Sequence, residues 1–222
     1  MKSVSKLPVV VLISGNGSNL QAIIDATREN LPIEIRAVIS NRPDITGLQR
    51  ARLAGIETAI LNHKTFPDRE SYDRALMKLI DSYAPDLLVL AGFMRILTAG
   101  FVRHYAGRVL NIHPSLLPKF SGLNTHQRAL DARDQLHGAS IHFVTEDLDG
   151  GPVIVQAQVV VESDDNAESL AARVLQKEHL IYPLAIRWFA EKRVSMDENG
   201  KVRMDGKRLE KPVVFTPQES IG

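Results

Sequence analysis

Short apolar runs alternate with amphipathic segments over the first half of the chain. Runs of four to eight residues predict strands at 9–14, 33–40, 58–61, 87–91 and 109–113. Segments with helical periodicity fall between them, at 19–29, 46–54, 68–83 and, more briefly, 98–105. Strands separated by helices are typical of βαβ units, in which the strands are parallel. The pattern therefore predicts an α/β fold with a mostly parallel, doubly wound, Rossmann-like sheet of about seven strands flanked by helices.

The pattern changes after residue 113. Two further strands are predicted at 140–144 and 153–161, and the connection between them, 147–152, is rich in turn residues. Asp165 and Glu168 have the spacing of a capping box ahead of a long amphipathic helix that reaches about Phe189. The Tyr182-Pro183 pair predicts a kink or a break within that helix.

The ends of the chain lack such periodicity. We expect residues 1–7 and about 193–222 to be peripheral tails of a single domain that spans 1–222. The exception is a small hairpin that could form around Asn199-Gly200 or around Asp205-Gly206.

Composition narrows the functional class. Lys and Arg number 27 against 26 Asp and Glu, and the charges are mixed along the chain, so no nucleic-acid footprint is visible. With no cysteine, a disulfide, a thiolate nucleophile and a cysteine-ligated metal are all excluded, and a reducing cytoplasm suits the chain. The apolar run from Val9 to Ile13 is too short for a signal peptide or a membrane span. We expect a cytoplasmic protein that acts on small molecules.

Asn111 and His113 stand two residues apart where the fifth predicted strand ends. Side chains alternate across a strand, so both should point to the same face. The Asn amide can hydrogen-bond an oxyanion, and imidazole is the side chain best suited to move a proton near neutral pH. Pro114 then stops the strand. The spacing indicates a catalytic pair, although a merely structural polar pair would look the same.

A glycine-containing loop, Ser-Gly-Asn-Gly-Ser-Asn at 14–19, follows the first strand and opens the first helix. Ligands of open α/β sheets bind at this edge, and backbone amides of a first helical turn attract anions. Leu20 replaces the third glycine of a dinucleotide fingerprint, and no P-loop lysine follows. The loop favours a phosphate monoester, while an ordinary helix-capping turn explains the same residues without a ligand.

Asp149 lies in the turn between the two later strands. If the topology brings this turn over the end of the fifth strand, its carboxylate would stabilise the protonated form of His113. The alternative is that Asp149 only caps its own turn, as Asp before Gly commonly does.

Two other chemistries receive little support. Metal binding by His113 with His126, His137 or His142 lacks a compact ligand motif. Ser115 lacks the Gly-x-Ser-x-Gly context of a hydrolase nucleophile.

Four stretches together resemble the phosphoribosylglycinamide formyltransferase family, and the similarity spans about residues 8–190. The stretches are 14–21 (SGNGSNLQ), 90–97 (LAGFMRIL), 111–118 (NIHPSLLP) and 138–152, which runs from GAS to DGGP. The resemblance implies the formyltransferase fold, and transfer of a formyl group from 10-formyltetrahydrofolate to the amine of glycinamide ribonucleotide in purine synthesis. It implies this folate as cosubstrate and no metal.

The resemblance also implies roles for individual residues. Asn111, His113 and Asp149 would be catalytic, with the amide and the imidazolium stabilising an oxyanion and the carboxylate holding the charge on the ring. The ribonucleotide would be bound by Gly15, Asn16, Gly17, Ser18, Asn19 and Glu178. The folate would be bound by Arg69, Met94, Arg95, Ile96, Leu97 and Asn111. Ser121 and Asn124 depart from the residues usual in this family, which concerns the loop after Pro118.

Three functional classes stay open at this point. Besides formyl transfer to the ribonucleotide, they are hydrolysis of the same folate or formyl transfer to another acceptor such as aminoacyl-tRNA, and a catalytically silent nucleotide-binding module. The extra regulatory or basic domain expected of the second class is not visible in these 222 residues. We expect a monomer or a homodimer.

Overall fold

The computed structural model describes residues 6–216. The chain divides into two compact units, Met1–Asn111 and Ile112–Gly222, which are described separately. The main sheet has eight strands, compared with the predicted number of about seven. Residues 1–5 and 217–222, which belong to the predicted tails, lie outside the described residues.

The first unit is a parallel sheet with alternating helices. Its strands lie in the order β3-β2-β1-β4-β5, and each neighbouring pair is parallel. The strands are β1 (Leu7–Ile13), β2 (Ile33–Ser40), β3 (Thr58–Ile60), β4 (Leu87–Leu90) and β5 (Val109–His113). The helices are α1 (Ser18–Glu29), α2 (Thr46–Leu53), the 3₁₀ helix η1 (His63–Thr65), α3 (Arg69–Asp81) and α4 (Ala99–His104). All the elements predicted before residue 113 are therefore confirmed, with shifts of one or two residues at their ends.

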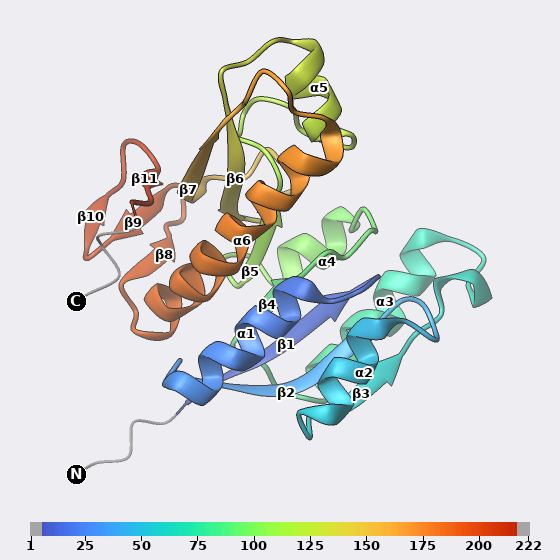
Figure 1. Ribbon diagram of the computed structural model, residues 1–222. Coiled ribbons are helices and arrows are strands. Elements are labelled where there is room, and N and C mark those ends of the chain that lie inside the picture. Colours follow the sequence, from blue (N-terminus) through green and yellow to red (C-terminus); the bar gives the residue numbers. More distant parts are fainter. Residues whose placement is uncertain (1–5, 217–222) are drawn as a thin grey trace. The chain divides into compact units, whose positions relative to one another are not determined.

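Strand β1 forms the centre of this unit. Its residues from Val9 to Ile13 are fully buried between β2 and β4, as expected of a continuous apolar run in a parallel sheet covered on both faces. Helices α1 and α2 lie side by side over β1 and β2 in Figure 1. The loops that follow the strands' carboxyl ends are thereby held on a rigid scaffold.

The second unit is built on an antiparallel pair. It contains α5 (Thr125–Asp131), β6 (Leu136–Phe143), β7 (Val153–Val160) and α6 (Ala167–Ala190). Strands β6 and β7 are antiparallel, and α6 packs along both of them (Figure 1). Strand β6 starts four residues before the predicted 140, and α5 was not predicted from the sequence.

The predicted start of α6 needs correction, and the alternative of a break within the helix is ruled out. The cap is formed by Asn166, whose side chain accepts from the backbone amides of Glu168 and Ser169. The Ser169 hydroxyl in turn accepts from the backbone amide of Asn166. The predicted Asp165–Glu168 box was thus displaced by one residue, because Asp165 binds Arg173 instead. The helix continues without a break through Pro183.

The segment expected to be a tail after residue 193 contains four short strands. Strands β8 (Val194–Met196), β9 (Val202–Met204) and β10 (Lys207–Arg208) form a small antiparallel sheet. A hairpin was expected at Asn199-Gly200 or at Asp205-Gly206, and the structure has a hairpin turn at both. Strand β11 (Val213–Val214) pairs in parallel with β7. Strands of two or three residues are too short to show periodicity, so β11 was not predicted. At the other end, Leu7 belongs to β1.

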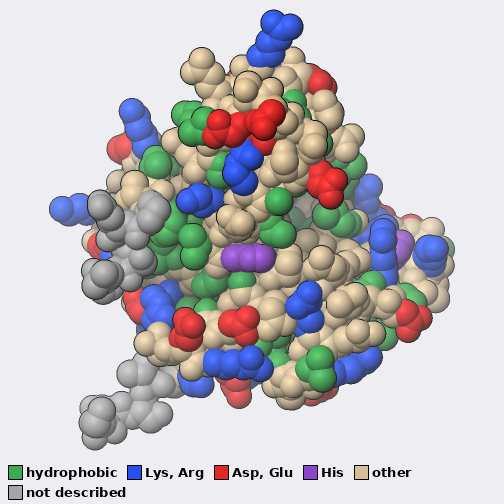
Figure 2. Space-filling model, in the orientation of Figure 1, with side chains coloured by type: hydrophobic (Ala, Val, Ile, Leu, Met, Phe, Trp, Pro, Cys, Tyr) green, Lys and Arg blue, Asp and Glu red, His purple; other side chains and the backbone are tan. Residues whose placement is uncertain are grey.

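The surface matches the mixed charge pattern of the sequence. On the face drawn in Figure 2, acidic and basic side chains are interspersed, without an extended patch of one sign. Within residues 6–216, no helix has the combined length and hydropathy needed to span a bilayer.

Candidate active site

Strand β5 ends in the two residues singled out by the sequence. Asn111 is half-buried, and His113 is 5 % exposed. They are separated by one residue of an extended strand, so their side chains leave the same face of β5. Asn111 is the last residue of the first unit and His113 is the second residue of the second unit.

The structure brings Asp149 to His113. The His113 Nδ1 atom lies 3.4 Å from Asp149 Oδ2, and the two side chains are 7 % and 9 % exposed. Asp149 has φ +51°, in the left-handed region, where Asp is among the few side chains that are tolerated. The turn between β6 and β7 thus presents the carboxylate to the ring, as the sequence predicted.

The loop after Pro118 supplies a partner to each member of this pair. His113 Nε2 lies 2.9 Å from the carbonyl oxygen of Phe120, and the amide of Gly122 donates to Asp149 Oδ2 at 2.8 Å. Phe120, Gly122 and Asn124 all have positive φ, at +55°, +79° and +57°. Of these three residues, Phe120 and Gly122 each direct one backbone group at the pair.

Both ring nitrogens of His113 therefore face oxygen acceptors. A neutral imidazole has one N–H and can donate to only one of them, whereas imidazolium donates to both. The ring therefore has an oxygen acceptor at each nitrogen, Asp149 Oδ2 at Nδ1 and the Phe120 carbonyl at Nε2.

The neighbouring histidines differ from His113. His142 is 2 % exposed, and burial lowers its pKa; its Nε2 lies 4.0 Å from Asp149 Oδ1. His126 Nδ1 and His137 Nε2 are 3.1 Å apart. Burial is the main cause that lowers the pKa of His126 and, to about 4, that of His137. Among residues 6–216 no group of three His, Cys, Asp or Glu side chains is arranged to hold a metal ion.

A second set of contacts fixes the turn that follows β5. The Ser140 hydroxyl donates to the Ser115 carbonyl at 2.7 Å and accepts from the Leu117 amide at 3.0 Å. The Gln156 amide donates to the Leu117 carbonyl at 2.8 Å. The Ser115 hydroxyl is fully buried and donates to the Lys119 carbonyl, so Ser115 contributes to the turn. Ser140 and Gln156 were not predicted to bind the turn after β5. Each is a single polar residue on its own strand, and neither forms a recognisable motif with its sequence neighbours.

The loop at 14–19 packs tightly at one of its glycines and is open at the other. Gly17 caps α1 with φ +74°, and a Cβ atom there would come within 2.7 Å of Gly47 Cα. A Cβ at Gly15 would meet nothing within 4 Å, so the loop is open above that residue. The Arg50 side chain, from α2, donates to the Asn16 carbonyl at 2.9 Å and places a cation beside the loop. Arg50 was not identified from the sequence.

Residues 94–97 follow β4 and Gly92, in irregular backbone of the first unit. The side chains of Met94 and Ile96 are 64 % and 53 % exposed. The Arg95 guanidinium lies over the Tyr72 ring, 5.4 Å from its centroid. Arg69, the first residue of α3, is exposed.

The remaining predicted residues lie in the second unit with His113 and Asp149. Glu178 is 7 % exposed on α6. The Ser121 carbonyl accepts from Arg128, and Asn124 caps α5 without a side-chain hydrogen bond. Both departures from the expected family residues therefore act through their backbone in this conformation of the loop.

The fold combines a mostly parallel sheet with a buried carboxylate–imidazole pair, Asp149 and His113, next to the end of β5. Residues 7–186 match the formyl transferase family, and the chain belongs to this family.

Named relatives make the comparison more specific. The chain is 59 % identical over 202 residues to phosphoribosylglycinamide formyltransferase of Escherichia coli (strain K12), covering 90 % of this chain and 95 % of that protein. It is 46 % identical over 198 residues to the human trifunctional purine biosynthetic protein adenosine-3, covering 89 % of this chain and 20 % of that protein. The solved structure of phosphoribosylglycinamide formyltransferase from Coxiella burnetii superposes with a TM-score of 0.91 at 55 % identity, covering 95 % of this chain and 100 % of that one.

Proposed function

We propose that this chain is a phosphoribosylglycinamide formyltransferase, which moves the formyl group of 10-formyltetrahydrofolate to the glycinamide amine of 5-phosphoribosylglycinamide in purine biosynthesis. The observation that carries the proposal is the buried contact between His113 and Asp149, in a chain whose 59 % identical relative bears that name. A silent binding module would have no need of such a pair.

The reaction is an acyl transfer between two nitrogens. The neutral amine attacks the formyl carbon, a C–N bond forms, and the carbonyl oxygen becomes an oxyanion. The intermediate collapses as the bond from carbon to folate N10 breaks. The amine loses one proton, and N10 gains one, so the products are the formylated nucleotide and tetrahydrofolate.

The side chains at the end of β5 suit this sequence. The Asn111 amide and the His113 imidazolium donate to the oxyanion, which is stabilised most when such donors are already in place. Asp149 holds the ring oriented and charged, and assists proton transfer from the amine to N10 through water. Because the Phe120 carbonyl now accepts from His113 Nε2, the loop has to release this atom before the ring can donate to substrate.

The substrates would be held by separate groups. Gly15, Asn16, Gly17, Ser18 and Asn19 bind the ribonucleotide phosphate, helped by the adjacent Arg50 cation, and Glu178 contacts the same substrate. The folate is read by backbone groups of Met94, Arg95, Ile96 and Leu97, with Arg69 and Asn111 at its other contacts. The chemistry calls for no metal, since an amine nucleophile and hydrogen-bond donors suffice.

Several broader features belong to the same proposal. Residues 1–222 act as a single formyltransferase domain, in accord with a family match that runs across both units. The enzyme works in the cytoplasm, without nucleic acid or membrane, as a monomer or a homodimer.

One assay separates this function from its rivals. The purified chain is incubated with 10-formyltetrahydrofolate, with and without 5-phosphoribosylglycinamide, and deformylation of the folate is followed by absorbance. We expect tetrahydrofolate to appear only when the nucleotide is present, together with one formylated nucleotide per folate. Release without the nucleotide would identify a hydrolase, and no release under either condition would contradict both activities.

A further inference from the structure

Residues 95–97 are held by few bonds of their own. They belong to no helix or strand, and no backbone group of Arg95, Ile96 or Leu97 is hydrogen-bonded to another residue of the described chain. Such a segment has no hydrogen-bond ladder to fix its shape. If it binds a ligand through backbone groups, its conformation has to be set at its ends.

The first end is fixed by a buried serine. Ser14, which follows β1, is 3 % exposed. Its hydroxyl donates to Asn41 Oδ1 at 2.6 Å and accepts from the Met94 amide at 2.8 Å. The Ser14 amide also donates to the Gly92 carbonyl at 3.1 Å. One residue at the start of the nucleotide loop therefore holds the start of the folate segment.

The second end is fixed by a buried carboxylate. Asp73 lies on α3 and is 1 % exposed. Its Oδ2 accepts from the Thr98 amide at 2.6 Å, while its Oδ1 has no hydrogen-bond partner in the described part of the chain. Burial of a carboxyl group is unfavourable unless its oxygens accept hydrogen bonds, so the bond to Thr98 is the one that offsets the cost of burying Asp73. Asp73 is thus committed to a single backbone amide.

We propose that Asp73 and Ser14 are positioning residues for the folate, which clamp the segment 94–97 at its two ends and so preorganise the backbone that reads the ligand. This inference rests on the proposed function, because that function assigns the segment to the folate. Neither side chain touches substrate in the proposal. Their effect is on binding, since a segment that is already ordered loses less entropy when the ligand arrives.

The test compares Asp73→Ala with Asp73→Asn. Alanine removes the acceptor for Thr98, whereas asparagine keeps an oxygen in nearly the same place and puts its NH₂ where Oδ1 makes no bond. We expect Asp73→Ala to raise the KM for 10-formyltetrahydrofolate about tenfold while kcat and the nucleotide KM change less than about threefold, as for loss of uniform binding. Asp73→Asn should restore most of the folate KM. Ser14→Ala should also raise the folate KM.

Hydrogen exchange of the amides supplies a readout that does not depend on turnover. Exchange at Thr98 should accelerate in Asp73→Ala and exchange at Met94 should accelerate in Ser14→Ala. Asp81→Ala is the matched control: it removes another carboxylate of α3, which accepts from the Tyr105 hydroxyl at 2.8 Å, and should leave the folate KM unchanged.

Three outcomes would overturn the clamp. They are a folate KM unchanged in Asp73→Ala despite faster exchange at Thr98, an equal defect in Asp73→Asn, and the same defect in Asp81→Ala. Failure of the proposed function looks different, because the wild-type chain would then transfer no formyl group. Calorimetric binding of tetrahydrofolate to wild type and Asp73→Ala would still test the clamp in that case.

Discussion

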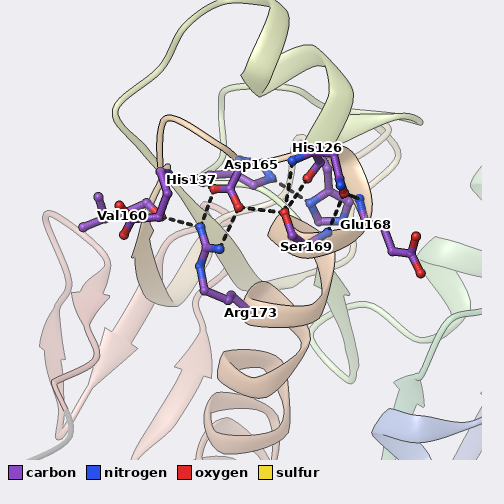
Figure 3. A network of polar contacts seen from close by, with 9 residues as sticks. His126, His137, Val160, Asp165, Glu168, Ser169 and Arg173 are labelled. Atoms are coloured by element: carbon purple, nitrogen blue, oxygen red, sulfur yellow. Dashed lines mark hydrogen bonds and ion pairs between the residues drawn. The ribbon is translucent and has the colours of Figure 1, made fainter.

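Two buried aspartates of the second unit, Asp149 and Asp165, are used in opposite ways. Figure 3 shows Asp165 facing Arg173 and Ser169. Its Oδ1 accepts from both of these side chains at 2.7 Å, and its Oδ2 accepts from Arg173 and from the Glu162 amide. With its side chain 2 % exposed, Asp165 is completely surrounded by donors.

The Asp149 side chain is 9 % exposed and accepts fewer hydrogen bonds. Its Oδ2 is shared by the Gly122 amide and His113, at 2.8 Å and 3.4 Å, and its Oδ1 has His142 at 4.0 Å. A carboxylate that accepts only short hydrogen bonds mainly stabilises the fold. A carboxylate with longer contacts and a titratable partner can change its bonds during a reaction, which is what proton transfer requires.

The largest expected effect falls on catalysis. Asp149→Asn and His113→Ala should each lower kcat/KM at least about 10²-fold, because in the proposed mechanism Asp149 is the charge partner of the ring and His113 is an oxyanion donor. Steady-state kinetics of the folded variants measures this loss, and circular dichroism confirms the fold. Near-wild-type turnover in either variant would remove that residue from the mechanism.

Asp165→Asn should lower the stability of the fold and leave catalysis almost unchanged. The Arg173 guanidinium holds the pKa of Asp165 below its usual range, and the substitution leaves that cation beside a neutral amide. We expect a lower Tm with kcat/KM within about threefold of wild type. If Asp165→Asn lost activity as severely as Asp149→Asn without unfolding, the contrast between the two carboxylates would be wrong.

The difference in Tm between wild type and Asp165→Asn should depend on pH, because proton binding is linked to folding. A carboxyl group whose folded pKa is depressed stabilises the protein above its unfolded value, here 3.8, and this contribution is lost as the pH falls through the lower folded value. The gap in Tm between wild type and Asp165→Asn should therefore be full at pH 7 and shrink below about pH 4.

A smaller effect is expected at His137. Burial lowers the pKa of its ring from 6.5 to about 4, so the unfolded chain binds a proton that the folded chain refuses between these values. Folding stability should fall as the pH drops from about 6.5 towards 4, and His137→Gln should flatten this slope. Thermal unfolding at pH 7.5 and pH 5 measures the change. Identical slopes in wild type and variant would show that the ring accepts its proton without loss of stability.

Sequence reasoning predicted the parallel half of the fold well, because buried strands such as Val9–Ile13 and the helices between them have clear periods. It did less well in the second unit. Helix α5 begins at a residue preceded by Asn124 in the left-handed region, with no side-chain cap to announce it. Strand β11 has only two residues.

In the site, too, features within one short segment could be predicted, whereas contacts between distant segments could not. The spacing of Asn111 and His113 and the turn around Asp149 could be read from residue types. The Phe120 carbonyl at His113 Nε2 could not, because it depends on a left-handed conformation at a bulky residue that has no intrinsic preference for it. The contacts of Ser14 and Asp73 with the ends of segment 94–97 were not predicted, because an isolated polar residue in an apolar context does not indicate its hydrogen-bond partner.

Strand β11 has a consequence for the behaviour of the protein in concentrated solution. An open strand edge is a template on which another molecule can add a strand, and long apolar edges invite self-association. Val213 and Val214 pair with Val155 and Gln156 of β7, and the Phe215 amide donates to the Gln156 carbonyl. A few residues near the end of the described chain thereby occupy the backbone groups of β7 around Val155 and Gln156, where another molecule could otherwise add a strand.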